Sequence, residues 1–259
     1  MATSPSPLPT PTARRLAALL TAAVLATGVT ACGDDDEGTA TSTTETAAET
    51  TASTSDTPAS TAEAPATTTE EQSADAGGCR TVEQPEPRSG EPDQPEPKPA
   101  RLSGSWTVTM NTSCGSFTIS LDTKRQPKTA ASFKSLAAAG FYDGLSFHRV
   151  VPGFVVQGGD PTGEGSGDAG YSVEETPPAD AAYTRGVVAM AKTGAEVAGT
   201  SGSQFFVVTG EDSGLPPDYA IVGEVTKGLD AVDRIAALGV GDGPPSQPVV
   251  ITKATAKKG

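Results

Sequence analysis

The side chains best suited to chemistry lie together in the stretch FHRVVPGFVVQGGD, from Phe147 to Asp160. It contains the only histidine of the chain, His148, and beside it Arg149, a permanent cation set among apolar residues. A cation in an apolar setting costs desolvation free energy unless a partner uses it. Gln157 adds an amide just before a Gly-Gly turn. One fixed cation and one amide on an apolar strand are typical of a site that binds an uncharged group and polarises it.

Other chemistries have weaker support in the sequence. The run GSGDAG, Gly165 to Gly170, spells G-x-G-x-x-G, but Glu164 and Asp168 would repel a phosphate and prolines follow instead of a helix. With one histidine and no closely spaced cysteines, we expect no metal site, and no G-x-S-x-G motif indicates a serine hydrolase. The chemistry expected here needs no cofactor.

The elements that position these residues are mostly strands, because apolar residues alternate with period two. We predict strands over residues 105–110, 115–121, 146–151, 154–157, 186–192, 204–209, 220–226 and 248–253. Two segments have helical period: one begins at Pro127 and stops by Gly140, and one covers 229–238. Many strands with two well-separated helices predict a mainly β fold, an antiparallel barrel with helices over its ends.

Four motifs, in this order, resemble those of the cyclophilin family of peptidyl-prolyl cis-trans isomerases. They are PKTAASFKSLAAAGFYDGLSFHRVVPGFVVQGGD, GVVAMAKTG, GTSGSQFFVVTGE and LPPDYAIVGEV. The resemblance runs from about Ser105 to Leu238, and it implies a closed eight-stranded antiparallel β-barrel capped by two α-helices, over residues 103–259. It also implies an enzyme that accelerates rotation about X–Pro peptide bonds in proline-containing polypeptides.

The same resemblance assigns roles to ten residues. Arg149 would be the catalytic residue, and the substrate would contact Phe154, Val155, Gln157, Ala191, Lys192, Gln204, Phe206, Leu215 and Tyr219. His148 would support Arg149. From the residues alone, Arg149 could equally belong to a buried ion pair, the two phenylalanines could be core aromatics, and the glutamines structural amides.

Three differences from well-known eukaryotic members concern the same site. Val155 replaces a common methionine, which shortens one wall of the pocket but keeps it apolar. Lys192 replaces a common asparagine, whose contact in the family is largely through the backbone. The loop from Lys192 to Ser203 looks longer than in those members.

Residues 1–31 have the features of a bacterial export signal. Arg14 and Arg15 precede an apolar run, Leu16 to Val29, that is too short to span a membrane. The run ends in Val-Thr-Ala-Cys, which resembles a lipoprotein signal, so we expect Cys32 to be lipidated and to anchor the protein on the extracytoplasmic side of the cell membrane. An ordinary signal peptide is the alternative, and general secretion and twin-arginine export both stay open.

Residues 32–102 are predicted to form a disordered tether, rich first in Thr and Ala and then in Pro. Residues 33–100 carry sixteen acids and three bases, a net charge of −13 out of −14 for the whole chain. The acidity therefore belongs to the tether, and no basic patch indicates a nucleic-acid partner.

If Cys32 carries lipid, Cys79 and Cys114 remain as a pair outside the cytosol, where a disulfide between them is favoured over two free thiols. We expect a monomer. The function predicted is that of a tethered isomerase that assists the folding of exported or cell-envelope proteins. A proline-binding module or chaperone with little turnover is the first alternative, and a cell-surface interaction protein is the second.

Overall fold

Ten strands and two helices form the part of the chain that the computed structural model describes, which is residues 78–88, 94–98 and 100–259. In chain order they are β1 (Trp106–Thr112), β2 (Gly115–Leu121), α1 (Pro127–Ala138), β3 (Arg149–Val151), β4 (Val155–Gly158), β5 (Val173–Glu174), β6 (Val187–Met190), β7 (Thr200–Ser201), β8 (Phe205–Val208), β9 (Ile221–Lys227), α2 (Leu229–Ala236) and β10 (Ile251–Lys258). The predictions for Cys32, for the signal peptide and for most of the tether lie outside the described residues.

Eight of the strands form one antiparallel sheet in the order β10-β1-β2-β9-β6-β8-β4-β3, and β5 pairs with β7 in a small second sheet. The main sheet is curled but open, so the prediction of a closed barrel is wrong in this respect. No ladder joins the edge strands β3 and β10 in the described part of the chain. An isolated bridge between Ser146 and Val250 connects the segments just ahead of them.

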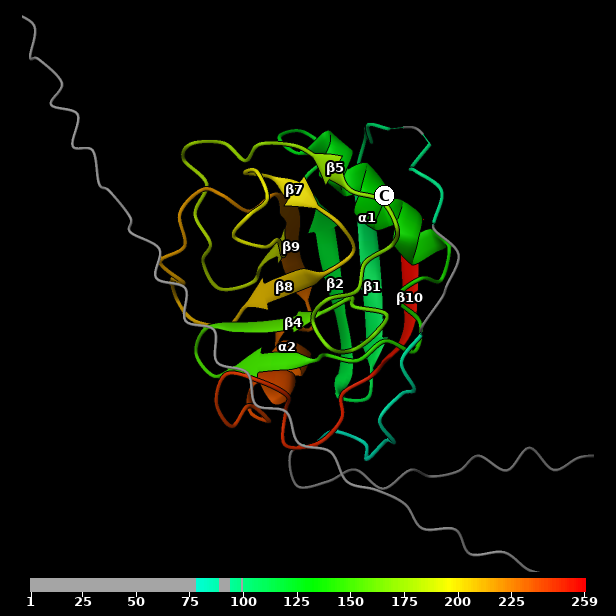
Figure 1. Cartoon of the computed structure of the whole chain (residues 1–259), viewed down its shortest axis with the longest axis vertical. Coiled ribbons are helices and arrows are strands. Elements are labelled where there is room, and N and C mark those ends of the chain that lie inside the picture. The colour runs from blue at the N-terminus through cyan, green and yellow to red at the C-terminus, as the bar shows by residue number, and fades with distance from the viewer. Residues whose placement is uncertain (1–77, 89–93, 99) are drawn as a thin grey trace, which may run out of the picture. The chain divides into compact units, whose positions relative to one another are not determined.

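The two helices lie at opposite ends of the curled sheet (Figure 1). Helix α1 packs against β5, β9 and β10, and α2 packs against β2, β3 and β4. Pro127 occupies the first turn of α1, where no backbone donor is needed, and Gly140 ends that region with a φ of 75°. Neither helix, nor any other helix among the described residues, is long and apolar enough to cross a membrane.

Alternation along the strands separates an inner core from an outer apolar cluster. On β8, Phe205 and Val207 belong to the main core, whereas Phe206 and Val208 belong to the outer cluster. On β4, Val156 faces the core and Val155 the outer cluster. Successive residues of a strand point to opposite faces, so the outer cluster is built on the outside of the same strands that enclose the core.

Residues 78–88 and 94–98, which lie ahead of the predicted domain, are part of the folded unit. A disulfide joins Cys79 to Cys114 in the β1–β2 turn, with Cα atoms 4.0 Å apart. The backbone N–H of Arg88 donates to Pro161 O at 2.9 Å and that of Gln94 to Ala169 O at 2.8 Å. Residues 78–88 and 94–98 therefore lie on the domain, whereas their composition predicts a disordered tether that extends to residue 102.

Candidate active site

One row of residues crosses four neighbouring strands on the outer face of the sheet. Arg149 on β3 pairs with Gln157 on β4, Gln157 pairs with Phe206 on β8, and Phe206 pairs with Ala189 on β6. Paired residues in adjacent antiparallel strands project from the same face, with Cβ atoms about 5 Å apart. The register thus brings a cation, an amide and an aromatic ring side by side.

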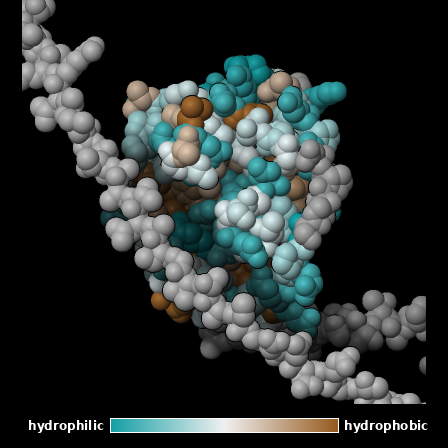
Figure 2. Space-filling view, viewed as in Figure 1, coloured by the Kyte–Doolittle hydropathy of each residue, from teal (hydrophilic) through white to brown (hydrophobic). Residues whose placement is uncertain are grey.

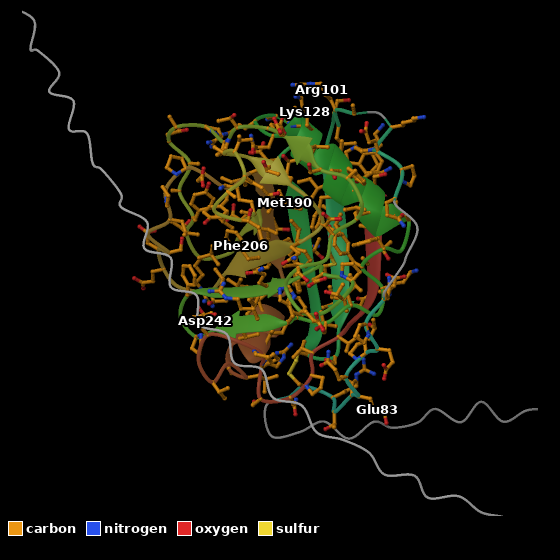
Figure 3. All side chains as sticks on the ribbon, in the orientation of Figure 1. Glu83, Arg101, Lys128, Met190, Phe206 and Asp242 are labelled. Atoms are coloured by element: carbon orange, nitrogen blue, oxygen red, sulfur yellow. A yellow bond between two sulfur atoms is a disulfide. The ribbon has the colours of Figure 1, made fainter. Side chains whose placement is uncertain are left out.

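A hollow of about 200 Å³ opens beside this row. Its volume is below the roughly 300–1,000 Å³ of pockets that hold drug-sized ligands, so it suits a small apolar group. The lining consists of nine of the ten residues assigned from sequence, namely Arg149, Phe154, Val155, Gln157, Ala191, Lys192, Phe206, Leu215 and Tyr219. Figure 3 labels one of them, Phe206, on β8. The face of the molecule seen in Figure 2 is mainly hydrophilic, and its hydrophobic residues form small separate areas.

The floor and edge of the hollow are aromatic. Phe206 is 4 % exposed, and its ring meets the ring of Tyr219 edge-to-face at 5.6 Å between centroids. Tyr183 fixes the backbone of Tyr219 by two hydrogen bonds. Its hydroxyl donates to Tyr219 O at 2.6 Å and accepts from Tyr219 N at 3.0 Å. These contacts shape the apolar wall before any ligand binds.

Arg149 is fixed at the rim by two partners. Its Nε donates to Asp242 Oδ1 at 2.5 Å and its Nη2 to Asp242 Oδ2 at 2.9 Å, while Nη1 donates to Gln157 Oε1 at 3.2 Å. The guanidinium carbon also lies 5.9 Å from the centre of the Phe154 ring. Figure 3 labels Asp242 in the loop that follows α2. A guanidinium carries five N–H donors, so Nη1 and Nη2 each keep one for a ligand in the hollow.

The same ion pair keeps both groups charged. The hydrogen bonds to Asp242 raise the pKa of Arg149 above its ordinary value, and they hold the pKa of the Asp242 carboxyl below its ordinary value. The Arg149 side chain is 31 % exposed and that of Asp242 is 65 % exposed. The pair contributes little to stability at such exposure, and its main effect is on the direction of the guanidinium.

Gln204, the tenth residue assigned from sequence, lies one step further along a chain of amides. Gln157 Nε2 donates to Gln204 Oε1 at 3.0 Å, and Gln204 Nε2 donates at 3.0 Å to the carbonyls of Gly165 and Gly167. Gln204 lines a larger hollow of about 610 Å³, which shares Gln157, Ala191 and Lys192 with the small one. The two hollows therefore form one continuous depression.

The glycine-rich run that spells G-x-G-x-x-G borders the larger hollow as a loop and leads to β5, not to a helix. Asp160, 1 % exposed, organises it by accepting hydrogen bonds from the N–H groups of Thr162, Gly165 and Gly167 and from the Thr162 hydroxyl. Burial alone would raise the pKa of Asp160, but these hydrogen bonds outweigh it and hold the pKa below its ordinary value. A carboxylate already occupies the donors that a phosphate would need.

His148 does not line either hollow. Neither ring nitrogen has a hydrogen-bond partner among the described residues. Burial lowers its pKa below 6.5, and the nearby Asp160 offsets that effect only in part. The imidazole beside Arg149 is therefore neutral near pH 7, and its supporting role stays a prediction.

The sequence does not predict two acidic residues of the site. Asp242 holds Arg149 from 93 positions away in the chain, and Asp218 forms an ion pair with Lys192 at 2.7 Å. Each lies in a Gly- and Pro-rich loop, where an aspartate is an ordinary turn residue. Among the described residues, no group of three or more His, Cys, Asp or Glu side chains is arranged to hold a metal ion.

The "Cyclophilin type peptidyl-prolyl cis-trans isomerase/CLD" family matches residues 107–256, more than half of the chain. The chain belongs to the cyclophilin family. The cyclophilin is 38 % identical over 154 residues to the peptidyl-prolyl cis-trans isomerase ppi1 of Schizosaccharomyces pombe, an alignment that covers 58 % of this chain and 97 % of the yeast protein. It is also 38 % identical over 170 residues to the probable peptidyl-prolyl cis-trans isomerase A of Mycobacterium leprae, covering 58 % of this chain and 91 % of the relative.

Solved structures of a Cryptosporidium parvum cyclophilin type isomerase resemble the same region. One has a TM-score of 0.56 and 28 % identity, and covers 60 % of this cyclophilin and 99 % of its own chain. A second, with a TM-score of 0.55 and 27 % identity over 59 % of this chain and 99 % of its own, was determined in the presence of the dipeptide Ala-Pro. The matched region is thus the isomerase domain, and residues 78–98 of this cyclophilin precede the family match.

Proposed function

We propose that Arg149 is the catalytic residue of a peptidyl-prolyl isomerase whose substrate proline occupies the small hollow. The observation that carries this proposal is the guanidinium of Arg149, held by Asp242 and Gln157 at the rim of an apolar hollow. Phe154, Val155, Phe206, Leu215 and Tyr219 would surround the prolyl ring.

The reaction needs this arrangement because the X–Pro amide is planar by resonance, with a rotation barrier of about 18–20 kcal/mol. Resonance is lost in the twisted transition state, and the prolyl nitrogen becomes basic. The remaining N–H donors of Arg149 stabilise that nitrogen or the polarised carbonyl more strongly than they stabilise either planar form. No proton needs to be transferred and no covalent bond is formed to the enzyme.

The other polar residues would bind the peptide on either side of the proline. The Nη1 donor of Arg149 already orders the Gln157 amide, which then offers its own groups to a substrate carbonyl. Ala191 and Lys192 follow the last residue of β6 and line both hollows. An extended peptide along this edge would pair with the backbone as an added strand does.

The decisive experiment measures isomerisation of a short Ala-Pro peptide by the purified protein and by two variants at Arg149. Arg149→Ala should lower kcat about 10²- to 10³-fold, the usual cost of losing one preorganised donor. Arg149→Lys keeps the charge but loses the guanidinium group that forms two hydrogen bonds with Asp242. This variant should therefore be faster than Arg149→Ala but slower than the parent. The control is Arg125→Ala, which removes an exposed arginine paired with Asp180 and should leave the rate unchanged.

An active parent whose Arg149→Ala variant keeps full activity would refute the assignment of Arg149. A parent that binds the peptide without turnover would favour the alternative, a proline-binding module or chaperone. The side-by-side placement of Arg149, Gln157 and the apolar hollow favours the enzyme.

The wider role belongs to the same proposal. A basic pair, a short apolar run and the Val-Thr-Ala-Cys sequence support export and lipidation of Cys32, so the isomerase would act on proteins folding at the outer side of the membrane. Slow X–Pro rotation, which takes tens of seconds unaided, limits folding there. Cys32→Ser should move the protein from the membrane fraction to the soluble fraction of the host cell without altering the activity of the domain. A protein that stays soluble in both forms would contradict the anchor.

A further inference from the structure

Lys192 lies where the two hollows meet, since it lines both. Its side chain is only 4 % exposed. An ammonium group that has lost nearly all contact with water is costly unless its donors are bonded and its charge is balanced. The partners of Lys192 therefore decide what this residue does.

The ammonium is engaged with the protein itself. Nζ forms an ion pair with Asp218 Oδ2 at 2.7 Å and donates to the carbonyls of Thr193 at 3.2 Å and Glu196 at 3.1 Å. Two hydrogen bonds and one ion pair thus satisfy the buried ammonium within the protein. We therefore do not assign the Lys192 side chain as a direct ligand of the substrate.

These bonds tie together two loops that border the depression. Thr193 and Glu196 belong to the loop between β6 and β7, the one whose sequence looks longer than in well-known relatives, and Asp218 lies just ahead of β9. A backbone hydrogen bond from Gly199 N to Asp218 O at 2.9 Å joins the same loops. The bonds of Lys192 Nζ add a side-chain link between the same two loops.

The ammonium also meets the aromatic edge of the small hollow. Nζ lies 5.6 Å from the centre of the Tyr219 ring, which also packs edge-to-face on Phe206 at 5.6 Å and on Tyr183 at 6.0 Å. A cation over an aromatic face attracts the ring. Tyr219 is thus held between a cation on one side and the floor of the hollow on the other.

We propose that Lys192 is a positioning residue for the proline pocket: through Asp218 and Tyr219 it keeps the pocket edge in the shape that receives the substrate. This rests on the proposed function, in which the small hollow takes the prolyl ring. Among the described residues, Lys192 forms no hydrogen bond or ion pair with Arg149, Asp242 or Gln157, so its loss weakens substrate binding and leaves the chemical step intact.

The test compares the full-length protein with Lys192→Met, which keeps the length of the side chain and removes its charge. We expect KM for an Ala-Pro peptide to rise roughly 3- to 10-fold, with kcat within twofold of the parent. Asp218→Asn should act in the same direction with a smaller effect. The matched control is Lys134→Met, which removes another cation from an aromatic ring, that of Trp106 at 5.2 Å, and should change neither constant.

A double-mutant cycle separates this role from a merely structural one. If Lys192 acts through Tyr219, Lys192→Met should raise KM less than twofold in a Tyr219→Ala background. Multiplicative effects, or a Lys192→Met variant with unchanged KM, would overturn the proposal, as would a loss of kcat alone. Circular dichroism checks that each variant is folded at the assay temperature.

Calorimetry with the same peptide provides a readout that needs no turnover. If the parent binds but does not isomerise the peptide, the proposed function fails, while a 3- to 10-fold rise in Kd for Lys192→Met would still support the positioning role. A parent that neither binds nor isomerises the peptide would overturn both.

Discussion

Asp242 holds Arg149 by a two-point ion pair, with Nε–Oδ1 and Nη2–Oδ2 distances of 2.5 and 2.9 Å. The contact joins the first residue of β3 to the loop that follows α2 in the chain. A bidentate pair fixes the plane of the guanidinium as well as its position. The charge that the reaction uses is therefore aimed before the substrate arrives, and the long arginine side chain has little orientation to lose on binding.

This relationship predicts the behaviour of Asp242→Asn. The amide keeps the size of the side chain but loses the charge and one acceptor, so Arg149 samples more directions. We expect kcat for an Ala-Pro peptide to fall roughly 3- to 10-fold with a smaller change in KM. Asp230→Asn is the control, since Asp230 is an equally ordinary surface acid paired with an arginine, Arg234 at 2.8 Å. An Asp242→Asn enzyme with parental kcat would show that Gln157 alone suffices to orient Arg149.

The sequence predicts that Arg149, Gln157 and Phe206 lie side by side, but it does not predict that Asp242 contacts Arg149. Period-two alternation predicts which residues of β4 and β8 share a face, and the order of the family motifs places those strands beside Arg149. The position of Asp242 depends on how the loop after α2 folds back. Three glycines and two prolines dominate the run GVGDGPPSQ, residues 239–247, and such a run has no period that predicts a contact.

The opposite faces of β8 predict different effects for neighbouring phenylalanines. Phe205 packs in the core against Phe133, Tyr142 and Phe147, whereas Phe206 forms the floor of the hollow. Phe205→Leu should lower the free energy of unfolding by about 1–3 kcal/mol and leave kcat/KM unchanged. Phe206→Leu should raise KM at least about 10-fold, because part of the apolar contact with the substrate is lost.

Denaturant unfolding and steady-state kinetics on both variants check this pair of predictions. Each variant serves as the control of the other, since both lose the same atoms from adjacent positions of one strand. If the two variants lost stability and activity in equal proportion, the separation between core and hollow would be contradicted.

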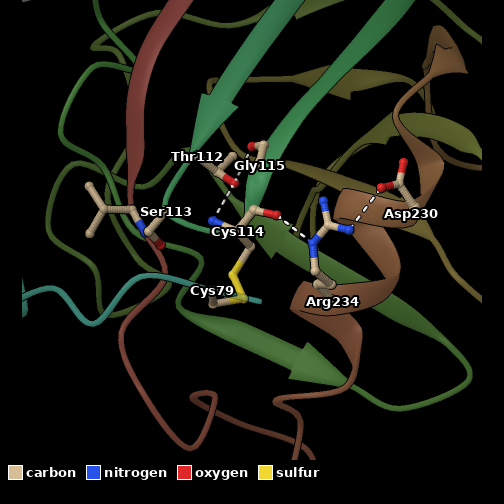
Figure 4. The surroundings of a disulfide bond; sticks show 8 residues. Cys79, Thr112, Ser113, Cys114, Gly115, Asp230 and Arg234 are labelled. Atoms are coloured by element: carbon tan, nitrogen blue, oxygen red, sulfur yellow. Dashed lines mark hydrogen bonds and ion pairs between the residues drawn. A yellow bond between two sulfur atoms is a disulfide. The ribbon is translucent and has the colours of Figure 1, made fainter. Parts of the chain in front are cut away.

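The disulfide predicts a third result. Cys79 and Cys114 are 35 positions apart, and their link ties the segment ahead of the domain to the β1–β2 turn (Figure 4). Replacing both by serine should lower the free energy of unfolding by about 2–4 kcal/mol, chiefly because the unfolded chain gains freedom. Neither cysteine lines a hollow, so kcat/KM should stay at the parental value.

Equilibrium unfolding of the double variant and of the parent, with and without reductant, measures this effect. The reduced parent should match the variant, and the variant should not respond to reductant. Equal stability of all forms would contradict a stabilising role. The turn keeps its other tie in every form, because Arg234 Nε donates to Cys114 O, a backbone atom, at 2.8 Å.

The same segment shows where composition misleads. Glu83 to Lys98 is rich in Pro and Glu, and such a run by itself cannot bury enough apolar surface to become ordered. In the structure, residues 83–88 and 94–98 of this run are held by groups outside it: the disulfide at Cys79, the buried Leu102, and the carbonyls of Pro161 and Ala169, which accept hydrogen bonds from the backbone of Arg88 and Gln94. None of these partners can be identified from the composition of the run.

The ends of the edge strands are a second feature that the sequence does not predict. The interior strand β2, by contrast, begins and ends where alternation predicts, at Gly115 and Leu121. The predicted strand 146–151 is shortened to Arg149–Val151, because Ser146 instead bridges to Val250 and Phe147 N donates to Val249 O at 2.9 Å. Alternation reports which residues are buried, but it does not report whether the two edges of a curled sheet meet.

His148 gives the last prediction, on the pH dependence of stability. Its pKa in the folded protein is below 6.5, chiefly because burial disfavours the charged imidazole. The unfolded chain therefore binds more protons than the folded one just below pH 6.5, so stability is complete above that pH and falls as the pH is lowered towards 5. The slope is at most about 1.4 kcal/mol per pH unit for one group. Asp160, whose pKa lies below 3.8, loses its contribution only in more acidic solution.

Since His148 is the only histidine, His148→Gln should abolish the change in stability between pH 7 and pH 5 that urea unfolding measures. A parent with flat stability over this range, or a variant that keeps the slope, would show that the imidazole is solvated or paired in a way that leaves its pKa near 6.5.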